Sequence, residues 1–281
     1  AALITHPAAA QIHFEGGWTD AGGIIVLGTD IPGTGTVENG GTSRTDVVVG
    51  GLAEGTLNIH PTGSLTVTEL LTLGEKSTGT LNVTGGSLHA AHLVAGTIWG
   101  SGTVNISGGT VNVGTMTVGL GTGPSSVSLS GGSLSVDGNL VVSRGDVEVS
   151  GGALDVGGDF ELGDQAFATL TLRNGGAVTV TNGKFYVGYE SDSSATIEGG
   201  SLKTGESWIG YRGNGEVHVS AGTWTASSLN LGMHGSGTLE ISGSGAVNAA
   251  GVGVGGLQGE GTLLLNGGTL ESDLVQLGYL K

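Results

Sequence analysis

Aromatic and charged residues gather in one short part of the chain. Four aromatic and three charged side chains are involved: Tyr186, Tyr189, Trp208, Tyr211, Lys184, Arg212 and Glu190. Aromatic rings beside ion pairs are typical of sugar-binding surfaces. A polysaccharide-cleaving enzyme would use a base such as Lys184 or Arg212 with a partner acid such as Glu190. The third interpretation is a ladder of rings and charges that only stabilises the fold.

The spacing of these residues follows a period that runs through the whole chain. Tyr186 and Trp208 are 22 residues apart, and so are Tyr189 and Tyr211. A short period of self-similarity is the signature of a solenoid, so both pairs are expected to stack in neighbouring coils. The period is marked by a glycine before an apolar run, at steps of 20 to 24 residues: Gly17, Gly41, Gly63, Gly86, Gly109, Gly132, Gly152, Gly176, Gly200, Gly222, Gly245 and Gly268.

Each repeat unit contains three short runs of alternating character. Two units read GTLNVTGGSLHAAHLVAG (79–96) and GTVNISGGTVNVGTMTVG (102–119). Strict alternation indicates strands with one buried face, and glycine pairs suit tight corners. No segment combines a helical apolar period with helix caps. The sequence therefore predicts an all-β, single-domain parallel β-solenoid, a right-handed β-helix of about 12 coils of about 23 residues with three short strands per coil.

The repeats also carry a recognisable motif. It reads G-[ST]-[LV]-x-[VI]-x-G-G-[ST]-[LV], followed by an apolar-x-apolar run and a glycine, over about residues 14–280. In this motif the chain resembles the glycine-rich repeats of autotransporter passengers and of exosortase-sorted (PEP-CTERM) surface proteins. The resemblance implies an extracellular β-solenoid on a bacterial surface, and it implies no catalytic residues. A β-propeller is the other fold considered, but its blades need about 40–50 residues.

Composition narrows the function classes. The chain has 24 acidic and 8 basic residues and a formal charge of −16, which makes nucleic acid a poor partner. It has no cysteine, so a disulfide scaffold and a cysteine metal site are excluded. No apolar run approaches the roughly 20 residues of a membrane helix. His89 and His92 are the nearest approach to a metal site, but their coil offers no carboxylate. We therefore expect no metal, no cofactor and no enzymatic activity.

Alternation also separates the inward from the outward positions of each coil. Trp224 aligns with Leu88 and Leu202 and is predicted to lie in the core. Outward threonine and asparagine columns are expected in the first strands, at Thr56, Thr80 and Thr103 and at Asn58, Asn82 and Asn105. The predicted core column of the first strands is apolar throughout: Leu57, Leu81, Val104, Val127, Val147, Leu170, Ile197, Val217, Leu239 and Leu263.

One further outward column is apolar in the first half of the chain. An apolar stripe of this length usually covers something, which predicts a lateral packing face. The alternative is strand propensity at solvated positions. The column occupies the middle of the third strand, at Val26, Val48, Thr72, Val94, Thr117 and Val141, and continues as Glu161, Tyr186, Trp208 and Asn230.

The two ends of the chain differ from the repeats. Residues 1–13 are expected to form an N-terminal cap or a docking segment, and residues 14–281 the β-solenoid. At the other end Leu277 occupies a regular third-strand position with no cap after it. The Ala1–Phe14 segment of a second copy would cover that coil by adding a strand, and repeated head-to-tail contacts build a filament. Truncation and self-capping are the alternatives.

These observations favour a structural function. We expect an extracellular rod, secreted or held at a bacterial cell surface, that assembles with copies of itself, head-to-tail and laterally, into a filament or stalk. The absence of an initiator methionine fits removal of a signal peptide, although a trimmed chain would look the same. The alternative function is a carbohydrate-binding or polysaccharide-cleaving β-helix that uses residues 184–212, with an extracellular polysaccharide as partner.

Overall fold

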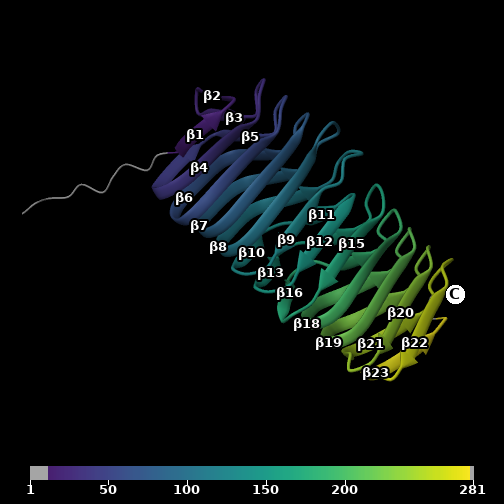
Figure 1. Ribbon diagram of the computed structural model, residues 1–281. Helices are drawn as coiled ribbons and strands as arrows, with labels where there is room; N and C mark the ends of the chain where they lie inside the picture. Colours follow the sequence, from purple (N-terminus) through teal and green to yellow (C-terminus); the bar gives the residue numbers. More distant parts are fainter. Residues whose placement is uncertain (1–11, 279–281) are drawn as a thin grey trace, which may run out of the picture.

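The chain winds into a β-solenoid. The computed structural model describes residues 12–278, and within this range every regular element is a β-strand. The strands stack in parallel about 23 residues apart through about 11 turns. Figure 1 shows the coils succeeding one another from the purple N-terminal end to the yellow C-terminal end. The predicted fold class is confirmed, and the predicted 12 coils are close to the observed number.

The longest strands lie on either side of a middle stretch in which every strand is short. The first group comprises β1 (Ile12–Gly16), β2 (Trp18–Ala21), β3 (Ile24–Leu27), β4 (Gly33–Arg44), β5 (Asp46–Val49), β6 (Gly55–Leu73), β7 (Thr78–Ala95) and β8 (Ser101–Val118). The middle group comprises β9 (Ser126–Leu129), β10 (Ser133–Val136), β11 (Leu140–Val142), β12 (Gly145–Val149), β13 (Ala153–Val156), β14 (Phe160–Leu162), β15 (Ala168–Leu172), β16 (Gly176–Val180) and β17 (Phe185–Val187). The last group comprises β18 (Ser193–Ile209), β19 (Gly215–Leu231), β20 (Gly237–Ser242), β21 (Ala246–Val254), β22 (Gly261–Asn266) and β23 (Thr269–Leu277).

Three separate strands per coil occur in the middle group, as predicted. In β6, β7 and β8 the strand instead runs on through the corners of the coil. The register between β6 and β7 shifts twice, between Ile59 and Ser64 and between Val67 and Leu70, which marks where the long strands bend. These long strands therefore contain the same three segments.

One continuous core runs through the coils. Trp224 is fully buried and pairs in register with Leu202 and Val247, which confirms its predicted place. The first-strand column needs one correction, because Ala195 and not Ile197 stands between Leu170 and Val217. Ile197 is also buried, one inward position further along the strand. Leu263 was expected to be buried but is only half-buried, because no described coil follows its own.

The predicted outward columns of the first strands are confirmed. Thr56, Thr80 and Thr103 stack in register, as do the three asparagines beside them. The Nδ2 atom of Asn82 donates a hydrogen bond to Asn58 Oδ1 at 2.9 Å, and that of Asn105 donates to Asn82 Oδ1 at 2.9 Å. The side-chain amides therefore form a ladder of hydrogen bonds on the outer surface of the solenoid, parallel to the backbone ladder that joins the coils.

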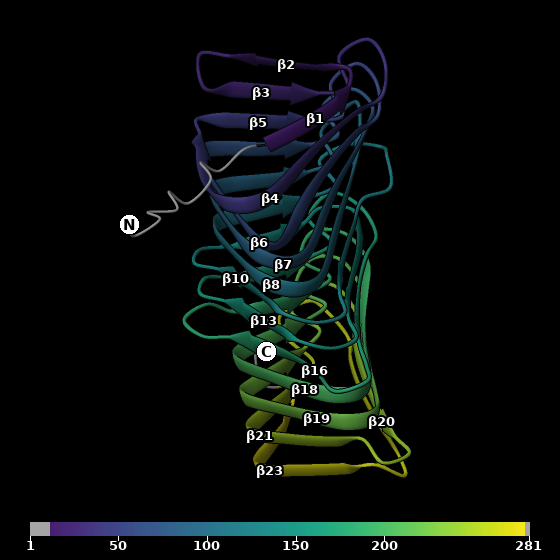
Figure 2. The same cartoon turned by 60° about the vertical axis from the view of Figure 1, so that its left-hand side comes forward.

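The N-terminal end departs from parallel stacking. β1 pairs antiparallel with β4, and β2 pairs antiparallel with β3, so parallel stacking begins where β3 meets β5 and β4 meets β6. The rings of Phe14 and Trp18 stack at 4.2 Å between centroids. Figure 2 shows β1 lying across this end of the rod. Of the predicted N-terminal segment, Ile12 and His13 belong to β1, and residues 1–11 lie outside the described residues.

The outward third-strand column has the predicted register. Successive pairings connect Val26 through Val48, Val94 and Val141 to Asn230. The four valines are half-buried and Thr72 is buried. Packing from the neighbouring corner contributes at one position, where Gly51 lies against Val26. The lateral packing face stays a prediction.

Candidate functional site

The predicted aromatic pairs lie in neighbouring coils. Tyr186 in β17 pairs with Trp208 in β18, which is the register that the sequence predicts. Tyr189 and Tyr211 lie on the corner loops that follow these strands, 188–192 and 210–214. Their rings are nearly parallel, at an interplanar angle of 8° and 5.6 Å between centroids. We call these four residues the aromatic cluster.

The rings of the aromatic cluster pack mainly against one another. Tyr186 is almost fully buried and meets both Tyr189 and Tyr211 edge-on, at 5.0 and 5.2 Å between centroids. Trp208 meets Tyr211 edge-on at 5.8 Å, and His234 does so at 6.4 Å. Edge-to-face and offset contacts are the favourable geometries for aromatic pairs. Much of the ring surface is therefore used within the protein, which favours the stabilising ladder over a sugar platform at this place.

The charged residues of this region make contacts from coil to coil. The Lys184 Nζ atom lies 3.0 Å from Glu206 Oε2, and the Lys184 backbone N–H donates to Asp159 Oδ1 at 2.8 Å. Arg212 makes an ion pair with Glu190. Both cations also lie over rings, Lys184 at 5.7 Å from the Trp208 centroid and Arg212 at 5.5 Å from that of Tyr211. The sequence correctly placed these groups together, and their binding role stays a prediction.

One carboxyl group of this region is electrostatically unusual. Glu161 pairs with Tyr186 in the outward third-strand column. Burial, followed by the negative charges of Asp159, Asp164 and Glu190, raises the pKa of Glu161 to about 7. Burial is also the main cause that raises the pKa of Tyr186 above its usual value. Glu161 can therefore hold or release a proton near neutral pH.

Glu161 makes the stability of the protein depend on pH in a defined direction. Its pKa is higher in the folded protein than in the unfolded chain, so folding favours the protonated form. This contribution is fully present below pH 4.5, and it is lost as the pH rises to about 7.

The wild-type melting temperature should therefore fall between pH 4.5 and 7, and we expect this fall to be smaller in Glu161→Gln. The same variant should have a higher melting temperature than the wild type at pH 8. Thermal unfolding followed by circular dichroism measures both, with Glu260→Gln on an exposed corner as the matched control. A Glu161→Gln variant that keeps the wild-type pH slope would contradict the assignment.

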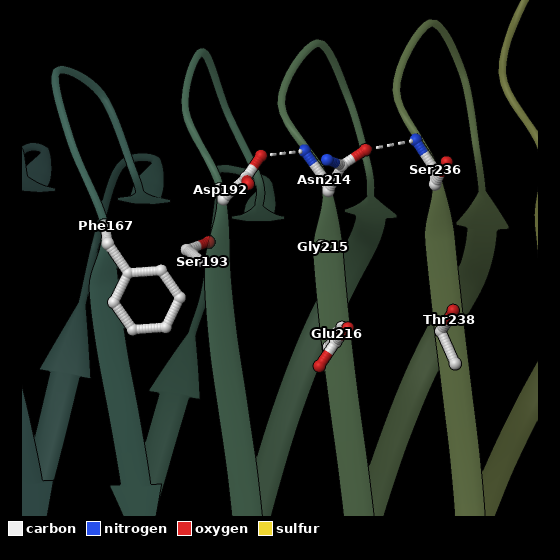
Figure 3. A pocket seen from close by; sticks show the side chains of 8 residues that line it. All are labelled: Phe167, Asp192, Ser193, Asn214, Gly215, Glu216, Ser236 and Thr238. Carbon is white, nitrogen blue, oxygen red and sulfur yellow. Dashed lines mark hydrogen bonds between the residues drawn. The ribbon is translucent and has the colours of Figure 1, made fainter.

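A second feature, which the sequence analysis missed, is a hollow at the starts of four first strands (Figure 3). Its volume is about 350 Å³. Its lining residues occupy three successive register positions of these strands, because Ala168, Ser193, Gly215 and Gly237 are in register. The residues that line it are Phe167, Asp192, Ser193, Asn214, Gly215, Glu216, Ser236 and Thr238. The sequence offered one sign of this hollow. Phe167 stands at a corner position that is polar in the next three coils.

The hollow and the aromatic cluster share their loops. Tyr189 lies on the same corner loop as Asp192, and Tyr211 on the same corner loop as Asn214. Asp192 Oδ1 accepts a hydrogen bond from the Asn214 backbone N–H at 3.0 Å. Asn214 Oδ1 accepts one from the Ser236 N–H at 3.1 Å. These bonds hold successive corners in the same conformation.

The residues predicted for assembly lie at two places. The four valines follow the rod in its N-terminal half up to Val141, whose neighbour Glu161 pairs with Tyr186 of the aromatic cluster. Leu277 lies in the last described coil, where it is 77% exposed. Across residues 12–278 no group of three or more histidine and acidic side chains is placed to hold a metal ion. The same range contains no helix long and apolar enough to cross a membrane.

The fold places the chain in the class of β-solenoid proteins. Comparisons with protein-family models, with curated proteins and with solved structures gave no significant match.

Proposed function

We propose that this protein is a structural rod that acts outside the cell, at a bacterial surface or in secreted material, and not as an enzyme. The observation that carries the proposal is the stacking itself. Parallel pairing runs without interruption from β3 and β4 to β22 and β23, around one continuous core. A solenoid of this kind is an extended, quasi-one-dimensional body. The resemblance of its repeats to those of bacterial surface proteins supports the extracellular location.

We further propose that the rods join end to end. Among the described strands, β22 pairs only with β20 and β23 only with β21, so both offer a free edge. Apolar side chains on these strands are exposed, Leu274 by 58% and Leu277 by 77%. Free strand edges beside exposed apolar side chains are a template for pairing with another chain. A second copy of this protein is the proposed occupant.

The structure changes one detail of the head-to-tail contact. The sequence favoured Ala1–Phe14 of the next subunit as the added strand, but Ile12, His13 and Phe14 pair with β4 of their own chain. One edge of this strand is therefore used within the subunit. Residues 1–11, the rest of the predicted docking segment, lie outside the described residues.

Assembly is tested by changing each partner separately. The wild-type chain is expected to form a concentration-dependent series of oligomers in sedimentation velocity and filaments in electron microscopy. Leu277→Asp, or deletion of residues 1–11, should leave monomers, because each removes one side of the contact. Ile98→Asp, on an exposed corner loop between β7 and β8, is the matched control and should assemble normally. A wild-type chain that stays monomeric at high concentration, or that stops at dimers, would refute the head-to-tail filament.

Carbohydrate binding or cleavage at residues 184–212 is the second candidate. It is favoured by half-buried rings lying beside the Lys184–Glu206 and Arg212–Glu190 ion pairs. Glu161 would supply a proton donor for cleavage, since its pKa is near 7. The double variant Tyr189→Ala/Tyr211→Ala tests this candidate by loss of oligosaccharide binding, measured by calorimetric titration.

A further inference from the structure

We propose that the hollow beside Phe167 binds a neutral, extended oligosaccharide that lies along the axis of the rod. No residue that lines the hollow belongs to the aromatic cluster or to β22 and β23, so the proposal does not rest on filament formation. Three properties of the hollow carry it: an exposed ring, fixed polar groups and the sign of its charge. Figure 3 shows the ring at one end and the polar side chains following in successive coils.

Phe167 is the apolar surface of the site. Its side chain is 57% exposed, whereas the two other phenylalanines of this region, Phe160 and Phe185, lie fully inside the core. The corresponding corner positions of the next coils hold Asp192, Asn214 and Ser236. An aromatic ring that stays in water beside polar groups gains free energy when an apolar face covers it. The C–H face of a pyranose ring is such a surface.

The polar groups are held in place before a ligand arrives. Asp192 and Asn214 each use Oδ1 to accept a backbone N–H from the next coil. This leaves Oδ2 of Asp192 as an acceptor and Nδ2 of Asn214 as a donor. The hydroxyl groups of Ser236 and Thr238 both donate and accept. Such a mixture suits sugar hydroxyl groups, which also do both, and fixed side chains lose little entropy on binding.

The spacing of these groups fits a chain of sugars. Neighbouring coils are about 4.8 Å apart, so the three steps from Phe167 to Ser236 span roughly 14 Å. The rise per unit of an extended hexose chain is similar to one step. An oligosaccharide lying along the rod would therefore meet one corner residue with each successive unit. This periodic match indicates a linear chain in preference to a single sugar.

The negative charge of the hollow disfavours the binding of acidic polysaccharides. Asp192 and Glu216 both line the hollow, and no lysine or arginine does. The chain as a whole carries a formal charge of −16. A polyuronate or a sulfated glycan would place its own charges beside these carboxylates, which repels it. A basic peptide is the competing occupant, but Asn214, Ser236 and Thr238 are uncharged and one oxygen of Asp192 is already bound.

Isothermal titration calorimetry on the full chain tests the proposal. The neutral probes are the β-1,4-linked tetrasaccharides of glucose, mannose and xylose, and the charged probes are tetragalacturonate and tetralysine. At least one neutral tetrasaccharide is expected to bind more tightly than either charged probe. Phe167→Ala should weaken that binding at least about tenfold, because a buried aromatic contact dominates such interfaces. Trp99→Ala, an exposed aromatic residue on another corner loop, is the matched control and should bind normally.

Two further variants define the site. Glu216→Gln should improve the binding of tetragalacturonate relative to that of the neutral probe, since it removes one repelling charge. Tyr189→Ala/Tyr211→Ala reports whether any binding occurs at the aromatic cluster instead of the hollow. The proposal is overturned if all three neutral probes fail, if a charged probe binds best, or if Phe167→Ala binds like the wild type. If only Tyr189→Ala/Tyr211→Ala loses oligosaccharide binding, the binding site is the aromatic cluster and not the hollow. Matching circular dichroism spectra establish that each variant is folded.

Discussion

Replacing Gly109 with alanine is expected to lower the free energy of unfolding by roughly 3–5 kcal/mol. Gly109 has φ of +75°, a left-handed conformation that costs an L-residue about 1–2 kcal/mol. A Cβ atom at this position would also lie 2.5 Å from backbone atoms of Gly85 and Gly86 in the preceding coil. Those backbone atoms belong to the stacked ladder, so they cannot retreat without lengthening its hydrogen bonds. The cost of this close contact therefore adds to the cost of the left-handed backbone conformation.

Gly175→Ala provides the control for this effect. Gly175 also has positive φ, +83°, but a Cβ atom there would meet nothing within 4 Å. Its substitution should cost only the conformational term, about 1–2 kcal/mol. Urea denaturation followed by far-UV circular dichroism compares the two variants with the wild type. Equal losses would show that the close approach of successive corners contributes nothing.

Trp224→Ala is expected to destabilise the protein by a similar amount, roughly 3–5 kcal/mol. The side chain fills the core between Leu202 and Val247 and meets Phe185 edge-on at 6.2 Å. Its indole N–H donates a hydrogen bond to Thr204 Oγ1 at 3.0 Å. Truncation would leave a large cavity and remove the donor from a buried hydroxyl group, and both effects destabilise.

Two further variants distinguish the loss of core packing at Trp224 from the general effect of removing a tryptophan. Trp99 is 77% exposed on its corner loop, and Trp99→Ala should change stability by no more than about 0.5 kcal/mol. Trp224→Phe should fall between the two alanine variants, because it refills most of the cavity but cannot donate to Thr204. Differential scanning calorimetry measures the three melting temperatures. Similar values for Trp224→Ala and Trp99→Ala would contradict the placement of Trp224 in the core.

The alternation of side chains made most of the fold predictable. In a strand the side-chain period is two, so apolar positions such as Leu57 and Leu81 identify the inward face directly. The repeat period in turn aligned Tyr186 with Trp208, and these two residues are paired in the sheet. The one slip in the core column, Ile197 for Ala195, spans two residues. A slip of two leaves both side chains on the same face, so the pattern could not reveal it.

The corners and the first strands were less predictable. A corner loop has no period, and its side chains are placed by the turn conformation and by the neighbouring coil. Phe167 therefore offered only a weak signal of the hollow, as the one aromatic residue at a corner position where the next coils have Asp192 and Asn214. The half-burial of Val26 depends on the adjacent corner at Gly51 in the same way. The antiparallel pairing of β1 has no counterpart in the repeats, so the repeat pattern could not predict it.

The way each coil is bonded determines how the rod would respond to being pulled by its two ends. A coil is attached only to the coil before it and the coil after it, so tension can detach the outermost coil while the rest stays folded. Each detached coil of about 23 residues would release roughly 80 Å of chain. A cell or filament tethered through such a rod could move far from its anchor without breaking the connection, and when the tension fell the remaining coils would serve as the template for rewinding.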